Sequence, residues 1–170
     1  MTTAQIVKNT KLFKALSDDQ LKAVIHLGQQ KSFEPGEEIY RHGEQAKTLY
    51  VLLNGSVSLR IEGPEELDVM AEKVEEVGSV FGVAALTKSH VYSVTAKCVR
   101  QATVLALDSA GLQEIIRREP ATGLEVMAEL AELYLKRLNL ARMGISSLYR
   151  IFKSQIRKAE VFDVYGELQY

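Results

Sequence analysis

Residues 30–108 limit the fold of this chain more than any other stretch, because apolar segments alternate there with turn residues. One apolar run ends at Asn54-Gly55, a dipeptide typical of a tight hairpin turn. The alternation of apolar and polar residues over 56–62 indicates a strand with one buried face. Further strands are expected over 91–98 and 102–107. Short strands with frequent turns predict a sandwich, a barrel or a roll.

A helix is expected before the strands. Ser17 is followed three residues later by Gln20, which is the pattern of a capping box at a helix start. Apolar residues then follow at helical spacing as far as Gly28, a residue suited to a helix end. The sequence therefore predicts a helix from about Ser17 to Gly28.

Helices are also expected after the strands. Ser109 is the predicted N-cap of a short helix, and Pro120 ends that helix and suits the first turn of the next. The next helix is expected over 121–142. Gly144 is expected to interrupt the pattern, and a final helix is expected over 146–159.

The expected long helix carries a broad apolar sector. One stripe steps by four, three, four and three residues, through Leu124, Ala128, Ala131, Leu135 and Leu138. A second stripe beside it contains Met127, Leu130, Tyr134 and Ala141. Such a helix must bury two sides. One side can cover the strands, and the other predicts a homodimer through the same helix of a second copy.

Four motifs, in this order and spacing, resemble the cyclic-nucleotide-binding domain family, as found in CRP/FNR-like regulators and protein kinase A regulatory subunits. They are Leu12-Phe13-x-x-Leu16-Ser17, Phe33-x-Pro35-Gly36-Glu37-x-Ile39-Tyr40-x-x-Gly43, Leu49-Tyr50-Val51-Leu52-x-x-Gly55-x-Val57 and Gly78-x-x-Phe81-Gly82. The resemblance implies an α+β, mainly β fold. It would be a double-stranded antiparallel, jelly-roll-like β-roll with N-terminal helices and a long C-terminal helix.

The domain organisation follows from this resemblance. A cyclic-nucleotide-binding-like domain is expected over 1–142, with the roll at about 30–108 and the long helix at about 121–142. Residues 143–170 are expected to be a helical extension. One helix and a tail are too little for a winged helix-turn-helix, so no DNA-binding domain is expected.

The resemblance also locates a ligand site. In the family, a short helix after the Phe-Gly pair points its amides at the cyclic phosphate. Here that helix would span Gly82 to about Leu86. The family's ribose-binding glutamate would fall at Val83, and its phosphate-binding arginine at His90. A valine cannot accept a hydrogen bond from a ribose hydroxyl, so altered or lost cyclic nucleotide binding is expected.

The candidate ligand-binding residues lie in this helix and directly before and after it. They are Phe81, Gly82, Val83, Ala84, Ala85, Leu86, Lys88, Ser89, His90 and Val91. Two interpretations stay open for Val83 to Ala85, which either fill the pocket with apolar atoms or shape it for another ligand. Lys88 to His90 either form an exposed loop or replace the anion site, with His90 as a pH-dependent donor.

Composition narrows the function classes. The 170 residues carry a formal net charge of −1, which favours neither nucleic acid nor an anionic membrane. The single cysteine, Cys98, excludes an internal disulfide and suggests a reducing compartment. No signal peptide and no apolar run of spanning length is recognisable, so a cytoplasmic domain is expected.

Catalysis is not expected. The three histidines do not converge, since His26 falls in a predicted helix and His42 in a predicted turn, so no metal site is predicted. Cys98 lies in an alternating strand, where a buried thiol is usual, and no nucleophile motif or phosphate loop is present.

Two functions are carried forward. The first is a regulatory, ligand-sensing module. Its ligand would be a cyclic nucleotide or another small anion, and binding would shift the packing of the long helix. The alternative is a ligand-free module for dimerisation or for binding a regulatory protein partner. An atypical site that still binds cyclic AMP or cyclic GMP is the second alternative, and an enzyme remains the remotest interpretation.

Overall fold

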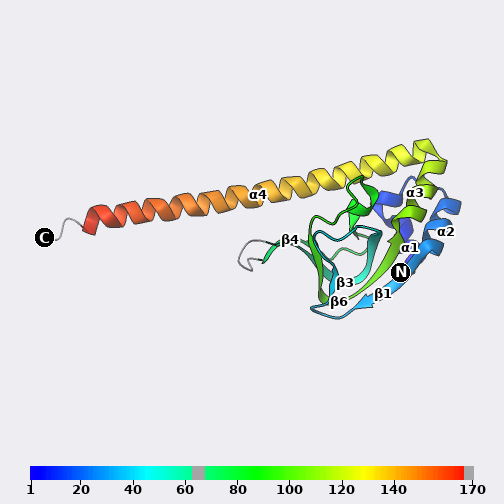
Figure 1. The fold of residues 1–170 in the computed structure, drawn as a ribbon, viewed down its shortest axis with the longest axis horizontal. Coiled ribbons are helices and arrows are strands. Elements are labelled where there is room, and N and C mark those ends of the chain that lie inside the picture. The colour runs from blue at the N-terminus through cyan, green and yellow to red at the C-terminus, as the bar shows by residue number, and fades with distance from the viewer. Residues whose placement is uncertain (63–67, 167–170) are drawn as a thin grey trace. The chain divides into compact units, whose positions relative to one another are not determined.

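The computed structural model describes residues 1–62 and 68–166 and divides into two units, residues 1–131 and 132–170. The first unit holds N-terminal helices, an antiparallel sheet and the helices that follow it (Figure 1). The second unit continues the last helix. The predicted α+β roll with N-terminal helices and a long C-terminal helix is confirmed.

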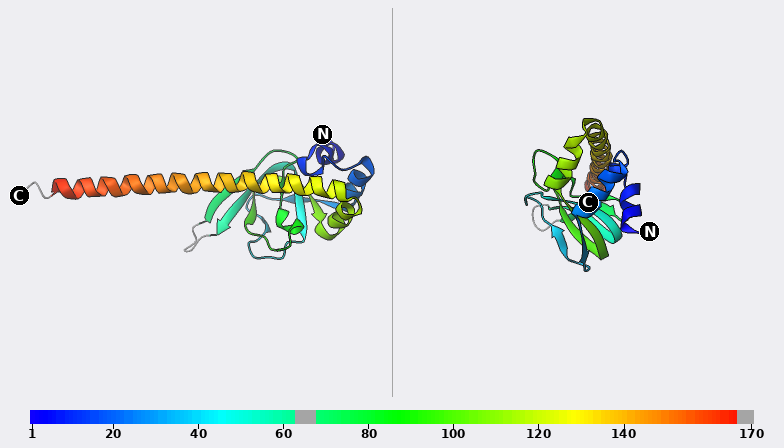
Figure 2. Two further views of the ribbon diagram at one scale, coloured as in Figure 1. Left: turned by 90° about the horizontal axis from the view of Figure 1, so that it is seen from above. Right: turned by 90° about the vertical axis from the view of Figure 1, so that its right-hand side faces the viewer.

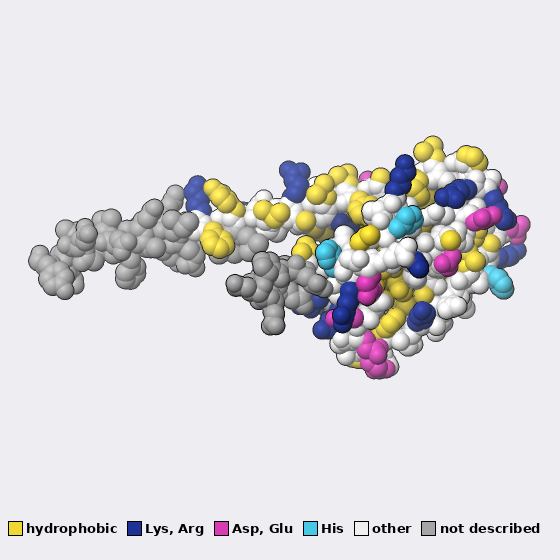
Figure 3. Space-filling model, in the orientation of Figure 1, with side chains coloured by type: hydrophobic (Ala, Val, Ile, Leu, Met, Phe, Trp, Pro, Cys, Tyr) yellow, Lys and Arg dark blue, Asp and Glu magenta, His cyan; other side chains and the backbone are white. Residues whose placement is uncertain are grey.

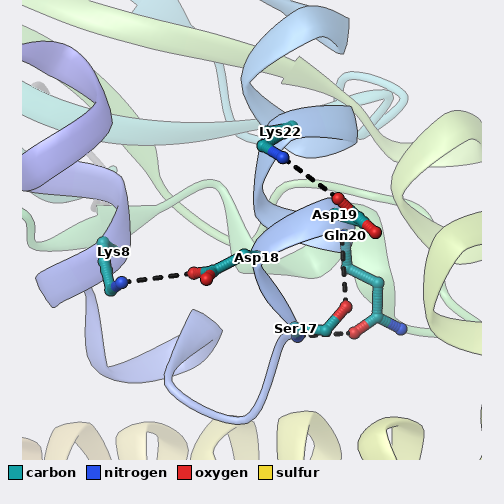
Figure 4. Close-up of polar contacts among 6 residues, drawn as sticks. All are labelled: Lys8, Ser17, Asp18, Asp19, Gln20 and Lys22. Carbon is teal, nitrogen blue, oxygen red and sulfur yellow. Dashed lines mark hydrogen bonds and ion pairs between the residues drawn. The ribbon is translucent and has the colours of Figure 1, made fainter.

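The N-terminal helices are α1 (Thr3–Asn9), the short 3₁₀ helix η1 (Lys11–Phe13) and α2 (Asp18–Leu27). The predicted capping box is present: the Gln20 N–H donates to Ser17 Oγ, and the Ser17 N–H donates to Gln20 Oε1 (Figure 4). Gly28 ends α2 as predicted, although its backbone is extended and leads directly into a strand. Because Gly28 has no side chain, the Leu105 side chain can pack against its backbone; a Cβ at this position would collide with Leu105.

In the described residues, six strands form one antiparallel sheet: β1 (Gly28–Phe33), β2 (Glu38–Tyr40), β3 (Thr48–Glu62), β4 (Asp68–Val74), β5 (Val80–Phe81) and β6 (Thr95–Asp108). The long strand β6 pairs with β1, β2 and β3, while β3 also pairs with β4 and β5. Because two long strands each have several partners, the sheet curls around an apolar interior (Figure 2). The three helices α1, α2 and α3 gather at one end of the strands (Figure 1).

Two predicted strand breaks are wrong. Asn54-Gly55 makes no hairpin turn, because β3 runs through it and shifts register against β6 on both sides of Asn54. Gly55 has φ +91° and lies against the backbone of Gln101 and Ala102, where a Cβ would collide with the Gln101 carbonyl oxygen. A glycine with positive φ suits a β-bulge as well as a turn. The expected gap between 98 and 102 is likewise absent, since β6 is continuous there.

Helices α3 (Ser109–Arg118) and α4 (Pro120–Gly166) follow β6. The predicted N-cap is displaced by one residue: Asp108, not Ser109, accepts the Gly111 N–H, over 2.9 Å. Pro120 opens α4 as expected. The predicted helix end at 142 and the interruption at Gly144 are wrong, because α4 is a single helix through these positions. A helical glycine costs only about 1 kcal/mol relative to alanine, too little to end a long helix.

The first turns of α4 bury one face and expose another. Thr122, Val126 and Leu130 are buried, whereas Leu124 is 70% exposed. Further along α4, large apolar side chains remain exposed at Leu135, Leu138, Ile145, Tyr149 and Phe152. Hydrophobic side chains are visible along the described part of this helix (Figure 3). The predicted boundary between domains at 142/143 stays a prediction.

Candidate functional site

The candidate cassette begins at β5 and continues through Gly82 into a 3₁₀ helix, η3 (Val83–Leu86). The helix therefore lies where the sequence predicts it. Gly82 is its N-cap and has φ +71°, a left-handed conformation that favours glycine. A Cβ on Gly82 would lie 2.9 Å from the Thr48 carbonyl oxygen and 3.0 Å from a Tyr50 ring carbon. Glycine thus lets η3 pack directly onto the start of β3.

The cassette side chains are buried. Phe81 and Ala85 are fully buried, Val83 is 4% exposed, and Ala84 and Leu86 are also buried. Phe81, Ala84 and Ala85 belong to the main apolar cluster inside the roll. The Ala85 N–H donates to the Gly82 carbonyl oxygen, so this amide is already satisfied within the cassette. This part of the predicted site is packed with the chain's own apolar atoms.

Four stacked aromatic rings lie in the roll beside the cassette. The Tyr40 and Tyr92 ring centroids are 3.8 Å apart, with 16° between the ring planes. Tyr50 stacks on Phe81 with centroids 5.1 Å apart, and Tyr40 lies 5.8 Å from Tyr50. The four rings come from separate parts of the chain: β2, β3, β5 and the segment before β6. Sequence reasoning missed this cluster, since only the pairing of the strands brings its members together.

The Tyr92 hydroxyl joins this cluster to the first residue of β3. It donates to the Thr48 carbonyl oxygen over 2.8 Å and accepts from the Thr48 N–H over 3.3 Å. Burial raises the pKa of Tyr92 strongly, and the neighbouring Tyr50 raises it further. Burial also raises the pKa of the Tyr50 phenol. Both phenols are therefore held neutral in the folded protein, as hydrogen-bonded parts of the core.

The segment after η3 is exposed. Lys88, Ser89 and His90 are exposed, Ser89 Oγ lies 3.2 Å from Thr87 Oγ1, and Val91 forms an isolated bridge with Gln45. His90 has φ +45°, the one non-glycine residue with positive φ among residues that the structure describes. The Ala46 N–H donates to the His90 carbonyl oxygen over 2.7 Å and fixes this conformation. The predicted arginine position thus holds a histidine in an unusual backbone conformation.

A groove of about 440 Å³ lies on the outer side of this segment, within the first unit. It is lined by Leu86, Thr87, Lys88 and His90, together with Gln113, Ile116, Arg117, Pro120, Gly123 and Met127 of α3 and α4. The structure therefore divides the predicted site into two parts. Phe81 to Ala85 are buried and do not line the groove, whereas Leu86, Lys88 and His90 do.

Gln113 and Arg117 are groove residues that sequence reasoning missed. Gln113 Nε2 donates to the Ala85 carbonyl oxygen over 3.3 Å, and its Oε1 accepts from the Arg117 guanidinium over 3.2 Å. Gln113 thereby connects the cassette to Arg117. The signal in the sequence is their separation by four residues on one face of a helix that follows the last strand.

Other reactive side chains lie away from both parts. Cys98 is buried, its single S–H lies within hydrogen-bonding reach of the Arg100 and Phe33 carbonyl oxygens, and burial raises its thiol pKa. His26 and His42 are exposed at separate positions, in α2 and in the turn after β2. In the described part of the chain, His, Cys, Asp and Glu form no group of three able to hold a metal ion. Nor is any described helix of a length and apolarity that would cross a membrane.

The comparisons with known proteins point to one family. The sequence model of the cyclic nucleotide-binding domain matches residues 30–119. A candidate potassium channel protein of Rhodopseudomonas palustris is 30% identical over 122 residues, 71% of this chain and 29% of that protein. The cAMP-dependent protein kinase regulatory subunit of Candida albicans is 30% identical over 115 residues, 68% of this chain and 24% of that protein.

A solved structure agrees with these matches. The crystal structure of a candidate cyclic nucleotide-binding protein from Geobacter metallireducens has a TM-score of 0.69 and 29% sequence identity. The match covers 81% of this chain and 99% of that one. The chain therefore spans nearly the whole of this structure, but less than a third of either curated relative.

Proposed function

This chain belongs to the cyclic nucleotide-binding domain family, and on that premise we propose that it is a regulatory domain with two properties. The interior of its roll binds cyclic AMP and cyclic GMP weakly or not at all. Its long helix α4 forms a dimer with a second copy of the chain. The first property rests on the packed aromatic rings beside the cassette, and the second on the exposed apolar stripe of α4.

The packed interior is the main support for weak binding. The rings of Tyr40 and Tyr92 are in contact, and Phe81, Ala84 and Ala85 complete the same buried cluster. A nucleotide placed beneath η3 would have to displace these side chains. Displacing close-packed rings loses their stacking energy, about 0.5–1.5 kcal/mol for each aromatic pair. This loss adds to the cost of exposing their apolar surface to water.

The polar groups of the cassette support the same proposal. Residues 82–90 contain no carboxylate, and the buried Val83 stands where the family's glutamate would bind the ribose. The resemblance places the family's arginine position at His90, which is exposed and lines the outer groove. A charge-assisted pair contributes about twice as much as a neutral hydrogen bond, so losing both partners weakens binding strongly.

Thermal unfolding of the 170-residue chain with cyclic AMP and with cyclic GMP tests this property. Ligand at 100 times its Kd stabilises a protein by about 2.7 kcal/mol, and ligand at its Kd by about 0.4 kcal/mol. We expect a millimolar concentration of either nucleotide to stabilise the chain by no more than the smaller figure. A cyclic AMP-binding member of the family serves as the positive control. Stabilisation by about 2.7 kcal/mol would refute weak binding.

The dimer is supported by the continuity of α4. The stripe at Leu124, Ala128, Ala131, Leu135 and Leu138 repeats every four and three residues, and beyond Gly144 it continues with Ile145, Tyr149 and Phe152. This is the seven-residue repeat of a two-stranded coiled coil. Leu135 and Leu138 are 52% and 57% exposed, although large apolar stripes are normally covered in soluble proteins.

The substitution Leu138→Glu tests the dimer by sedimentation velocity. A charge in the middle of the stripe is expected to convert a dimer into a monomer. Met143→Glu is the matched control, because Met143 is 67% exposed but lies off the stripe, and it is expected to leave the dimer intact. A wild-type chain that sediments as a monomer would overturn the dimer and favour a regulatory protein as the partner of this face.

A further inference from the structure

The outer groove combines an apolar wall with a basic rim. Leu86, Ile116 and Met127 contribute apolar side chains, and Lys88, His90 and Arg117 contribute basic ones. Its volume of about 440 Å³ falls within the ~300–1,000 Å³ typical of small-molecule sites. Such sites are mostly apolar with a few convergent polar groups, which is the composition of this groove.

Among the described residues that line the groove, none is acidic, so the basic rim has no acidic counterpart there. The two carboxylates of the neighbouring helical residues are engaged elsewhere: Glu114 pairs with Arg118, and Glu119 accepts from Gln20 and Thr122. In the part of the chain that the structure describes, neither Lys88 nor Arg117 forms an ion pair with a carboxylate. Among the residues that the structure describes, no carboxylate therefore pairs with these two cations of the groove.

Two contacts hold this rim in place. Arg117 donates to Gln113 Oε1 and leaves its other guanidinium N–H groups available, while Gln113 is itself anchored to the Ala85 carbonyl. His90 is kept in its left-handed conformation by the hydrogen bond from Ala46. A non-glycine residue in this conformation is strained, and such strain often accompanies ligand sites.

We propose that the groove between residues 86–90, α3 and the first turns of α4 binds a small organic phosphate outside the roll. The planar fork of Arg117 and the point charge of Lys88 suit phosphate oxygens. The side chains of Leu86, Ile116 and Met127 suit an apolar body attached to that phosphate. This site is separate from the packed interior, so it does not depend on whether a cyclic nucleotide enters the roll.

Isothermal titration of the full 170-residue chain with phenyl phosphate tests the proposal, with inorganic phosphate and benzoate as comparison probes. Phenyl phosphate is expected to bind more tightly than either, because only it carries both the apolar body and the phosphate. Phosphate bound as tightly as phenyl phosphate would show that the apolar wall is not used. Benzoate bound as tightly would show no selection for phosphate. Either result, or no binding of phenyl phosphate at millimolar concentration, would overturn the proposal.

Three charge-removing variants locate the site. Arg117→Gln and Lys88→Gln are each expected to weaken phenyl phosphate binding by about tenfold, the effect of losing one charge-assisted contact. Arg118→Gln is the matched control on the same helix, since Arg118 is exposed and does not line the groove, and its binding is expected to stay within about twofold of wild type. An equal loss in all three variants would indicate nonspecific attraction and refute the site.

Two further measurements keep the result unambiguous. Thermal unfolding without ligand is expected to be the same for all variants, because the substituted side chains are exposed. Cyclic AMP is titrated into wild type and Arg117→Gln. Cyclic AMP binding that survives in Arg117→Gln would place this nucleotide in the roll and refute weak binding there. The phenyl phosphate series alone tests whether the groove binds an organic phosphate.

Discussion

Replacing Tyr92 with phenylalanine removes one buried hydroxyl and leaves the stacked ring in place. That hydroxyl makes both a donor and an acceptor contact with the backbone of Thr48, and Tyr92 is only 4% exposed. Leaving buried polar groups without their partner costs about 1–3 kcal/mol. We therefore expect Tyr92→Phe to lower the free energy of unfolding at pH 7 by about 1–3 kcal/mol, measured by urea denaturation followed by circular dichroism.

The same substitution has a second effect at alkaline pH. Burial raises the pKa of Tyr92 above that of the unfolded chain, where a tyrosine titrates near ~10. Above about pH 10 the unfolded state releases this proton and the folded state keeps it, so stability falls as the pH rises. One such group contributes a slope of about 1.4 kcal/mol per pH unit. Below about pH 10 both states keep the proton, and the contribution is constant.

In the wild-type chain Tyr50 contributes to the same alkaline loss, because burial raises its pKa too. We expect the slope in Tyr92→Phe to be shallower than in wild type by about 1.4 kcal/mol per pH unit. Tyr149→Phe is the control, because Tyr149 is 66% exposed, and it is expected to leave the stability at pH 7 unchanged. A Tyr92→Phe protein as stable as wild type with an unchanged slope would show that the hydroxyl is not buried against Thr48.

Three further substitutions test the fold by urea denaturation. Gly55→Ala is expected to lower the free energy of unfolding by more than about 2 kcal/mol, because it combines positive φ with a backbone collision. Gly36→Ala is the comparison: Gly36 has φ +93° but open space around it, so the loss is expected to be only about 1–2 kcal/mol. Equal losses would contradict the bulge geometry at Gly55. Ser17→Ala removes the capping hydroxyl of α2 and is expected to cost about 1 kcal/mol, and no loss would mean that the cap is open in solution. Leu112→Ala empties a fully buried position on α3 and is expected to cost about 2–5 kcal/mol; a loss well below this would indicate that α3 does not pack on the core.

Much of the fold could be predicted because it is encoded locally. The capping box of Ser17 and Gln20 and the helix start at Pro120 each depend on residues a few positions apart, whereas the cassette after Gly82 was expected from the family resemblance. The errors arose where one local pattern fits two structures. Asn54-Gly55 supplies positive φ for a turn or for a bulge, and the partner strand β6 decides between them.

The candidate site was harder to predict because it depends on tertiary contacts. The position of η3 followed from the sequence, and so did the apolar character of Val83. The stacking of Tyr40 on Tyr92 did not, because these residues are far apart in the chain and meet only through the register of the sheet. The basic rim could not be foreseen either, since Arg117 reaches the groove only through the packing of α3.

The single thiol at Cys98 gives the chain a built-in reporter of unfolding. Cys98 is 2% exposed and its S–H lies within hydrogen-bonding reach of the Phe33 and Arg100 carbonyl oxygens, so an alkylating reagent meets it only when β6 separates from its neighbours. Because burial raises the thiol pKa, little reactive thiolate forms while the sheet is intact. The rate of iodoacetamide labelling therefore measures how often the roll opens, and a ligand that stabilises the roll would slow this labelling.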